Sequence, residues 1–557
     1  MLHYHIFSEF PHRHFLNIEI QTPEIQDNEF DLYLPNWRPG RYELGNFAQN
    51  IRDVHIVDQD GEEVKFEKQS KSQWRCFETK GKQLKISYLY YSNVLDAGSC
   101  FVDEALFYVN PIHCCMYHLP WRNEPLILSL DYPDSFELSL HESLRISEKT
   151  VQFSSVDHLL DSPFFASQSF QVLDYEVAQS ETKFRLCFFG LTNTFDEQKV
   201  LSDFKRFTAH QLSKLGAFPS DFYDFIFLLT PFKTYHGVEH QSSTVIALGP
   251  ESDVFTTDLY QEFLHVSSHE LYHTWNVKAL RTKDMKPYDY QSENYSRLGY
   301  WYEGLTTFMG DVMLWESGVI SDVQWETILN KWLKIHFSNQ GHEHLSVADS
   351  SFDTWLDGYK LGIPNRKVSI YQDGALCMLM LHAACKINGH EDGLHEVMRY
   401  LIHNEMIMKE GFEEQELKNL LIQFGGEEAR HILEAYVYGT QPYDIGLKKA
   451  CNSLNYSFEE KENTNFFSGY LGVQIKENKS GLELLKVWEG GRADYYGLAV
   501  GDTIVGIQNK PAKPDFSFNE IQNIHLNIKT KWRNFDLVIP KSEQQFSSYP
   551  IFEIKLN

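Results

Sequence analysis

The stretch Ser268-His269-Glu270-Leu271-Tyr272-His273-Thr274-Trp275 is the most informative part of this 557-residue chain. It lies in a continuous helical pattern of apolar residues that begins near Leu259. Residues four apart on a helix share one face, with their Cβ atoms about 5–6 Å apart. His269 and His273 can therefore point one ring nitrogen each at a single Zn²⁺, while Glu270 reaches a water bound to that ion. The spacing predicts the centre of a zinc hydrolase.

Such a centre needs a third protein ligand and an open fourth position. Glu303 supplies a carboxylate in the first turn of a second predicted helix, with 29 residues between it and His273. The alternative for Glu303 is an acid stabilised by the helix dipole, but its place after the paired histidines favours the ligand. Asp311, two turns further on, is expected either to orient a ligand imidazole or to be a solvated acid. We expect His265 to be a supporting or buried histidine.

The patterns around this motif divide the chain into three predicted domains. Residues 1–170 alternate with a period near two between turn signals, which predicts an N-terminal antiparallel β-sandwich. Residues 171–460 carry helical periodicity, with short β elements at 224–229 and 243–248, and form the predicted catalytic domain. The polar stretch 459–465 is typical of a linker, and strand alternation returns in a third domain at 466–557. The fold class predicted is multidomain α+β.

Composition excludes several partners and locations. With 50 Lys and Arg against 77 Asp and Glu, the net charge of −27 repels phosphate backbones and anionic lipids, so we expect neither nucleic acid nor membrane as a partner. Eight irregularly spaced cysteines without a CxxC pair favour reduced thiols. The first residues lack the features of a signal peptide, and no run approaches 18 apolar residues, so we expect a cytoplasmic protein.

Four landmarks in order resemble the glycyl aminopeptidase family of zinc metallopeptidases, relatives of thermolysin and aminopeptidase N. They are Leu34-Pro-Asn-Trp-Arg-Pro-Gly-Arg-Tyr42 with Phe47-Ala-Gln-Asn-Ile51, Tyr235-His-Gly-Val-Glu-His-Gln-Ser-Ser243, the segment from His269 to Phe308, and a C-terminal segment similar to a PDZ domain. The resemblance implies a thermolysin-like, mainly helical catalytic domain. It also implies that His269, His273 and Glu303 hold one Zn²⁺ per chain and that Glu270 is the general base.

The resemblance implies a substrate-binding role for the segment that contains Gly237, Glu239 and His240. Glu239 occupies the place of a glutamate that receives the free α-amino group of the substrate in related aminopeptidases. The residues themselves indicate the end of an edge strand that could pair with an extended peptide. A desolvated carboxylate there suits an ammonium ion. The alternative for Glu239 is an exposed surface acid.

Tyr371 matches a tyrosine that related aminopeptidases place just before a Lys-Gly pair, where it donates a hydrogen bond to the oxyanion of the tetrahedral intermediate. Asp373 stands here where lysine is usual in those relatives, which alters the local charge. The alternative for Tyr371 is a buried aromatic residue at the start of a helix.

The C-terminal domain resembles a PDZ domain, whose backbone N–H groups bind a peptide C-terminus while the peptide adds a strand. The segment that matches the carboxylate-binding loop comprises Gly469, Tyr470, Leu471, Gly472 and Val473. The alternative is a packing element whose groove the catalytic domain closes.

Three hypotheses follow for the function. The first is a zinc aminopeptidase that hydrolyses the N-terminal bond of peptides by attack of a zinc-bound water activated by Glu270, with a Gly or Ala preference that only the family name suggests. The second is a zinc endopeptidase to which the PDZ-like domain tethers substrates. The third is an inactive peptide-binding scaffold, which the intact set of His269, Glu270, His273 and Glu303 opposes.

Overall fold

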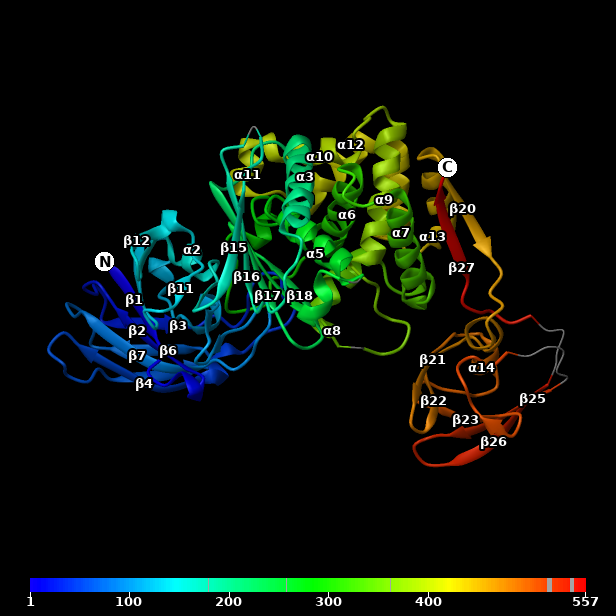
Figure 1. The fold of residues 1–557 in the computed structure, drawn as a ribbon, viewed down its shortest axis with the longest axis horizontal. Coiled ribbons are helices and arrows are strands. Elements are labelled where there is room, and N and C mark those ends of the chain that lie inside the picture. The colour runs from blue at the N-terminus through cyan, green and yellow to red at the C-terminus, as the bar shows by residue number, and fades with distance from the viewer. Residues whose placement is uncertain (179, 257, 361, 518–522, 541–544) are drawn as a thin grey trace.

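The computed structural model describes residues 1–557 except 179, 257, 361, 518–522 and 541–544. Its three regions follow one another along the long axis of the molecule, with the N-terminal sheets at one end, a helical body in the centre and a smaller C-terminal unit at the other end (Figure 1). None of the described helices is both long and apolar enough to cross a membrane.

The N-terminal region consists of three sheets, which agrees with the expected β-rich domain. The largest runs in the order β12-β13-β10-β1-β2-β7-β4, and its strands alternate buried and exposed residues as the period of two requires. Its strands are β1 Leu2–Phe7, β2 Phe15–Gln21, β4 Ile51–Asp58, β7 Leu84–Tyr91, β10 Leu126–Asp131, β12 Arg145–Ser147 and β13 Thr150–Phe153.

Two smaller sheets complete this region, and one pairing corrects the expected topology. The sheets are β3-β6-β5 (Glu29–Tyr33, Gln73–Phe77 and Phe66–Ser70) and β11-β14-β9-β8 (Glu137–Leu138, Phe164–Ser167, Leu106–Val109 and Phe101–Val102). We expected an antiparallel sandwich, but β1 pairs with β10 in parallel, from Leu2 opposite Leu126 to Phe7 opposite Asp131. More than a hundred residues separate these strands, so local periodicity carries no information on their relative direction.

A five-stranded mixed sheet begins the catalytic region, where the sequence indicated only a short β element. It runs in the order β15-β16-β17-β19-β18, with β16, β17 and β19 parallel and β18 antiparallel at the edge. The strands are β15 Phe170–Tyr175, β16 Lys183–Phe189, β17 Phe222–Leu229, β18 Thr234–Glu239 and β19 Ser243–Gly249. β17 and β19 are buried almost throughout, as strands covered on both faces are, and they therefore lack the alternation that reveals a half-exposed strand.

Helices form the rest of the catalytic region, as the periodicity predicts. The longer ones are α3 Glu197–Leu215, α5 Leu259–His273, α6 Thr306–Glu316, α7 Asp322–Phe337, α8 Val347–Asp357, α9 Gln372–Ile387, α10 Leu394–His403, α12 Glu414–Ile432 and α13 Tyr443–Ser453. A π-helical turn, Tyr300–Leu305, leads directly into α6. Most buried apolar residues of this region and of the N-terminal sheets form one continuous core, and a smaller second cluster also joins strands of both regions.

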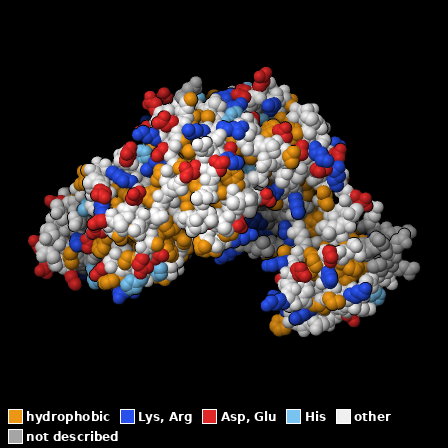
Figure 2. All heavy atoms as spheres, in the orientation of Figure 1, with side chains coloured by type: hydrophobic (Ala, Val, Ile, Leu, Met, Phe, Trp, Pro, Cys, Tyr) orange, Lys and Arg blue, Asp and Glu red, His pale blue; other side chains and the backbone are white. Residues whose placement is uncertain are grey.

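The C-terminal unit has a core of its own, built on the sheet β21-β22-β23-β25-β26. Its strands are β21 Val473–Asn478, β22 Gly481–Val487, β23 Thr503–Ile507, β25 Asn523–Lys529 and β26 Asn534–Pro540, and β24 Lys510–Pro511 pairs with β23. A recess separates this unit from the helical body (Figure 2).

The chain crosses between this unit and the body twice. The stretch predicted as a linker at 459–465 is partly wrong, because β20, Tyr456–Lys461, pairs antiparallel with the last strand, β27, Ile551–Leu556. These two strands lie beside α7 (Figure 1), and the side chain of Asn330 exchanges hydrogen bonds with the backbone of Ile554. The last strand of the chain thus belongs to the body and not to the C-terminal sheet.

Candidate active site and metal centre

Helix α5 carries the paired histidines on its last turns. The Nε2 atoms of His269 and His273 lie 2.9 Å apart, as the spacing of four residues on one helical face predicts. Nδ1 of His273 lies 2.8 Å from the carbonyl oxygen of Asn276, which can only accept, so this nitrogen carries the proton. In the neutral ring, the form that binds a metal, the lone pair of His273 is therefore on Nε2, the atom that faces His269.

Glu303 meets the two histidines from the π-helical turn before α6. Its Oε2 lies 3.5 Å from Nε2 of His269 and 3.4 Å from Nε2 of His273. π-Helical turns inside helices frequently occur at functional sites, because the extra residue re-aims a side chain. The turn is buried, and it packs against the start of α9, where Gly374 contacts Gly304.

The three residues fit a metal ion. In tetrahedral coordination with bonds of about 2.0–2.1 Å, neighbouring ligand atoms are roughly 3.4 Å apart. The observed separations of 2.9, 3.4 and 3.5 Å lie around that value. Among the residues that the structure describes, this is the only group of three or more His, Cys, Asp or Glu side chains with ligand atoms converging in this way. Burial lowers the pKa of His273, but the adjacent Glu303 carboxylate outweighs burial and raises this pKa to about 10, so a positive charge is favoured here.

Glu270 lies beside these three residues, and one oxygen of its carboxylate is available to accept a proton. It is buried, and its Oε2 has no hydrogen-bond partner within the described part of the chain. Burial raises the pKa of Glu270 well above its ordinary value; His273 opposes the rise, and Glu239 and Glu303 add to it. Gly237 on β18 makes room for this side chain, because a Cβ at that position would lie 2.2 Å from Oε1 of Glu270.

A cavity of about 400 Å³ opens in front of these residues. The structure brings nine of the residues selected from the sequence to its walls: Gly237, Glu239, His265, His269, Glu270, His273, Glu303, Asp311 and Tyr371. β18 is the edge strand of its sheet, as expected, and Tyr235 on it is half exposed.

Glu239 is a buried residue and not the exposed surface acid of the alternative. The backbone of Gly40, from the N-terminal domain, covers its carboxylate so closely that a Cβ there would lie 2.5 Å from Oε2 of Glu239. Tyr359, from the segment after α8, donates a hydrogen bond to the carbonyl of Gly40 at 3.3 Å. Gly40 and Glu239 both line the cavity, so a loop of the N-terminal domain covers the carboxylate at this part of its wall.

His240 is the residue of the predicted substrate segment that does not line the cavity. Successive side chains of a strand point to opposite faces, so its ring lies on the other side from Glu239. Nδ1 of His240 is 3.1 Å from Oδ1 of Asp161, which also binds Nζ of Lys278 at 2.7 Å. His240 thus belongs to a contact between the N-terminal domain and the catalytic region.

Tyr371 lines the cavity at the residue before α9, and burial raises its pKa well above the ordinary value. Asp373, which stands where the resemblance implies a lysine, is buried and does not line the cavity. Its carboxylate accepts hydrogen bonds from Nδ1 of His336 and, at 2.9 Å, from the backbone N–H of Ser369. The aspartate therefore stabilises the start of the helix that carries Tyr371.

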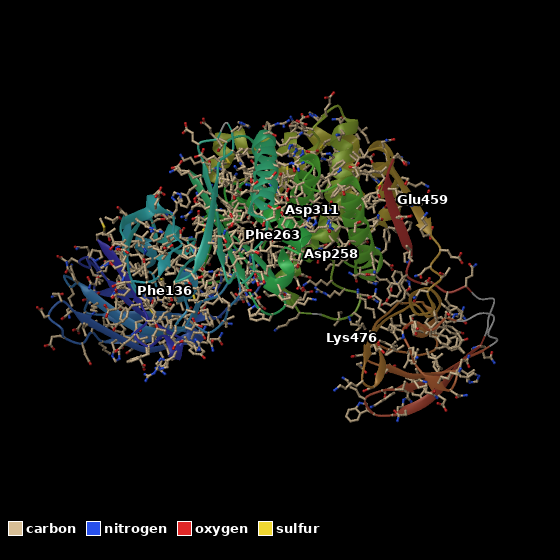
Figure 3. The ribbon with its side chains drawn as sticks, viewed as in Figure 1. Phe136, Asp258, Phe263, Asp311, Glu459 and Lys476 are labelled. Atoms are coloured by element: carbon tan, nitrogen blue, oxygen red, sulfur yellow. The ribbon has the colours of Figure 1, made fainter. Side chains whose placement is uncertain are left out.

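Asp311 lies among the central helices (Figure 3), but the imidazole that it orients is not one of the paired histidines. Its Oδ1 is 2.5 Å from Nδ1 of His265, one turn before His269 on α5. Asp311 therefore pairs with His265 at the wall of the cavity and does not orient the imidazole of His269 or His273, which was one of the two roles expected of it. This contact agrees with the supporting role expected for His265.

The segment predicted as a carboxylate-binding loop forms a π-helical turn, Phe466–Leu471, that precedes β21. The N–H groups of Gly469 and Tyr470 donate to the carbonyl of Asn465 at 2.8 and 3.0 Å, and that of Gly472 donates to Phe467. Leu471 and Val473 are buried. β21 itself lies at an edge of its sheet.

Tyr42 is a site residue that the sequence did not indicate as one. Its hydroxyl donates a hydrogen bond to Oε1 of Glu303 at 2.8 Å. Tyr42 is the last residue of the segment Leu34–Tyr42, which resembles a family motif. Nothing in that motif indicates the contact with Glu303, because Glu303 lies 261 residues further along the chain.

Comparisons with known proteins identify the family to which this chain belongs. The family model of the peptidase M61 N-terminal domain matches residues 3–168, and that of the M61 glycyl aminopeptidases matches residues 262–377. Together they span just over half of the chain, across both the N-terminal sheets and the helices of the candidate site. The fold and these matches define a peptidase. The chain belongs to the M61 glycyl aminopeptidase family, which confirms the resemblance in the sequence.

A solved structure supports the fold over the whole length. An aminopeptidase N family protein from Idiomarina loihiensis aligns with a TM-score of 0.87 at 22% identity, covering 100% of this chain and 98% of that one. An M1 zinc metallopeptidase from Deinococcus radiodurans aligns with a TM-score of 0.49 at 13% identity over 79% and 94% of the two chains, too low a likeness to bear on function. No curated protein sequence matches the chain.

Proposed function

We propose that the protein is a zinc-dependent aminopeptidase of the HExxH…Glu type, which releases the N-terminal residue of peptides. The observation that carries the proposal is the convergence of His269, His273 and Glu303 beside Glu270, in a cavity that the covered carboxylate of Glu239 also lines. Two imidazoles and one carboxylate are a ligand set of hydrolytic zinc sites. When bound, Zn²⁺ supplies a Lewis acid for the peptide carbonyl and lowers the pKa of a bound water to about 7.

Glu270 acts as the general base in this proposal. Its buried carboxylate, with one oxygen free of hydrogen bonds, accepts a proton from the attacking water and passes it to the leaving amine nitrogen. Tyr371 donates its hydroxyl proton in a hydrogen bond to the oxygen that becomes negative in the tetrahedral intermediate. Both residues line the same cavity.

Glu239 fixes the N-terminus of the substrate. A buried carboxylate suits the α-ammonium group, and charge-assisted hydrogen bonds of this kind are about twice as strong as neutral ones. Because the loop at Gly40 covers Glu239, little chain could extend beyond the amino group, which supports an aminopeptidase over an endopeptidase. A preference for small first residues such as Gly and Ala is suggested by the family name alone.

The C-terminal unit is proposed as a PDZ-like accessory that captures peptides. Among the described strands β21 lies at an edge of its sheet, which supports strand addition. The engaged N–H groups of Gly469, Tyr470 and Gly472 leave less scope for binding a carboxylate. In the second candidate function, this unit tethers substrates of an endopeptidase.

One experiment separates these functions. A short peptide and its N-acetylated form are incubated with the zinc-loaded enzyme, and the products are identified by mass spectrometry. The aminopeptidase releases the first residue of the free peptide and cleaves the blocked one far more slowly. Internal cleavage of the blocked peptide would establish the endopeptidase instead, and no cleavage of either would favour the inactive scaffold.

A further inference from the structure

The two oxygens of the Glu303 carboxylate have different neighbours. Oε2 faces the Nε2 atoms of His269 and His273, at 3.5 and 3.4 Å. Oε1 accepts the hydroxyl proton of Tyr42 at 2.8 Å. A phenol keeps its proton at neutral pH, so it acts here as a donor and not as a competing metal ligand.

The segment that carries Tyr42 is fixed at several points. Indole Nε1 of Trp37 donates to the carbonyl of Arg41, and the backbone N–H of Asn36 donates to the carbonyl of Tyr290 at 2.8 Å. The Tyr42 ring lies edge-on to Trp355 with 6.4 Å between the ring centroids. The hydroxyl is therefore held on Glu303 by contacts on both sides of the domain boundary.

Tyr42 differs in position from the other two tyrosines near Glu303. Tyr359 and Tyr371 both line the cavity, whereas Tyr42 does not appear among the described residues of its wall. A peptide in the cavity thus has access to Tyr371 but not to the hydroxyl of Tyr42, which the carboxylate of Glu303 already holds. Any effect of Tyr42 on the chemistry passes through Glu303.

We infer that Tyr42 is a positioning residue of the metal centre, which holds Oε1 of Glu303 so that Oε2 alone binds the metal. This inference rests on the proposed metal site. Partners of this kind orient a ligand and fix its free oxygen, and their loss typically lowers metal affinity or activity about 10–100-fold. The metal site of this enzyme is consequently shared by two domains, with its ligands on α5 and the turn before α6 and its orienting group on the N-terminal domain.

The test is the Tyr42→Phe variant of the full chain, which removes one oxygen and keeps the ring. The dissociation constants of Zn²⁺ and Co²⁺ are measured by competition with a chromophoric chelator, and the absorption spectrum of the Co²⁺ form reports the coordination geometry. We expect metal binding to weaken about 10–100-fold and the Co²⁺ bands to shift. Tyr359→Phe is the matched control, because it removes a hydroxyl bonded to the same N-terminal loop but not to Glu303; its metal affinity should equal that of the wild type.

Each result decides the inference. An unchanged dissociation constant and spectrum for Tyr42→Phe would overturn it, as would an equal loss in Tyr359→Phe. Thermal unfolding of the metal-free proteins is compared as well, and a lower midpoint for Tyr42→Phe without metal would attribute the loss to packing and also overturn it. If the wild type itself binds no metal, the proposed function fails and not only the role of Tyr42.

Discussion

The N-terminal domain and the C-terminal unit lie at opposite ends of the helical body and are joined to it in different ways. The apolar core of the N-terminal sheets continues into the catalytic region, whereas the C-terminal sheet has a separate core. The N-terminal domain covers Glu239 with Gly40 and reaches Glu303 with Tyr42. The N-terminal domain is therefore part of the catalytic unit.

The C-terminal unit contacts the body through polar groups that do not line the cavity of the candidate site. The backbone N–H of Glu489 donates to Oε1 of Gln340 at 2.8 Å, and Nζ of Lys486 donates to the carbonyl of Ser338 at 3.1 Å. Charge also divides the chain at this boundary, because residues 466–557 have 11 basic and 10 acidic residues while the whole chain carries −27. We expect this unit to affect substrate capture and not bond cleavage.

Glu270→Gln is expected to have the largest effect on turnover. It tests whether bond cleavage depends on the helical body. Glutamine keeps the shape but cannot accept the proton, so kcat should fall about 10²–10⁴-fold while the metal content stays at one per chain. Metal analysis and steady-state kinetics on a free tripeptide measure both quantities. Normal turnover in this variant would remove Glu270 from its role.

Asp161→Asn tests how firmly the N-terminal domain is joined to the catalytic region. Asp161 binds Nζ of Lys278, which is buried, and Nδ1 of His240. Loss of its charge leaves the Lys278 ammonium unpaired, which should lower the free energy of unfolding by about 3 kcal/mol, at the low end of the range for buried pairs because Asp161 is partly exposed. Denaturant unfolding measures the change.

The same contact predicts a dependence of stability on pH. Burial alone would raise the pKa of Asp161, but Lys278 and His240 hold it well below its ordinary value. Its contribution is therefore present above about pH 3.9, the pKa of an ordinary aspartate, and is lost as the pH falls below that value. Asp134→Asn removes an exposed pair with Lys149 in the same domain, and because solvent screens that pair, it should change stability and its pH dependence much less. An Asp161→Asn protein as stable as this control would show that the two regions are joined loosely.

Glu239→Gln should weaken only the recognition of the free amino group. Loss of a charge-assisted contact of about 1.5–3 kcal/mol lowers kcat/KM for free peptides roughly 10–100-fold. Activity on an N-acetylated peptide, already low, should not fall further. Equal losses on both substrates would mean that Glu239 acts elsewhere than at the ammonium group.

The smallest effect expected is that of Gln340→Ala at the C-terminal contact. The lost hydrogen bond to Glu489 is worth about 1 kcal/mol, so the amide of Glu489 should exchange with solvent about five-fold faster. Activity on a tripeptide should be unchanged. A clear fall in tripeptide turnover would contradict the division between a catalytic unit and an attached one.

The sequence was sufficient to predict features that depend on local periodicity or on a short motif. Periodicity, spacing and family motifs predicted the pairing of His269 and His273 on one helix, the carboxylate of Glu303 and the edge strand at Gly237. The structure brings these features together. The parallel pairing of β1 with β10 and the return of β27 to β20 depend on contacts between distant segments. The contact of Tyr42 with Glu303 likewise exists only after two domains pack.

Asp311 and His240 show a finer limit of the sequence. Both residues lie close in sequence to residues of the site, yet their hydrogen-bond partners are not the predicted ones. Asp311 contacts His265, and His240 contacts Asp161. The period of a helix or strand gives the face of a side chain but not the partner that it finds there.

The most direct test of the central claim is a crystal structure of the protein grown with Zn²⁺, with anomalous diffraction recorded on both sides of the zinc absorption edge. We predict one strong peak within bonding distance of Nε2 of His269, Nε2 of His273 and Oε2 of Glu303, with Oε1 still bonded to Tyr42. The absence of a peak there, or a single peak elsewhere in the molecule, would contradict the proposed metal centre and the function built on it.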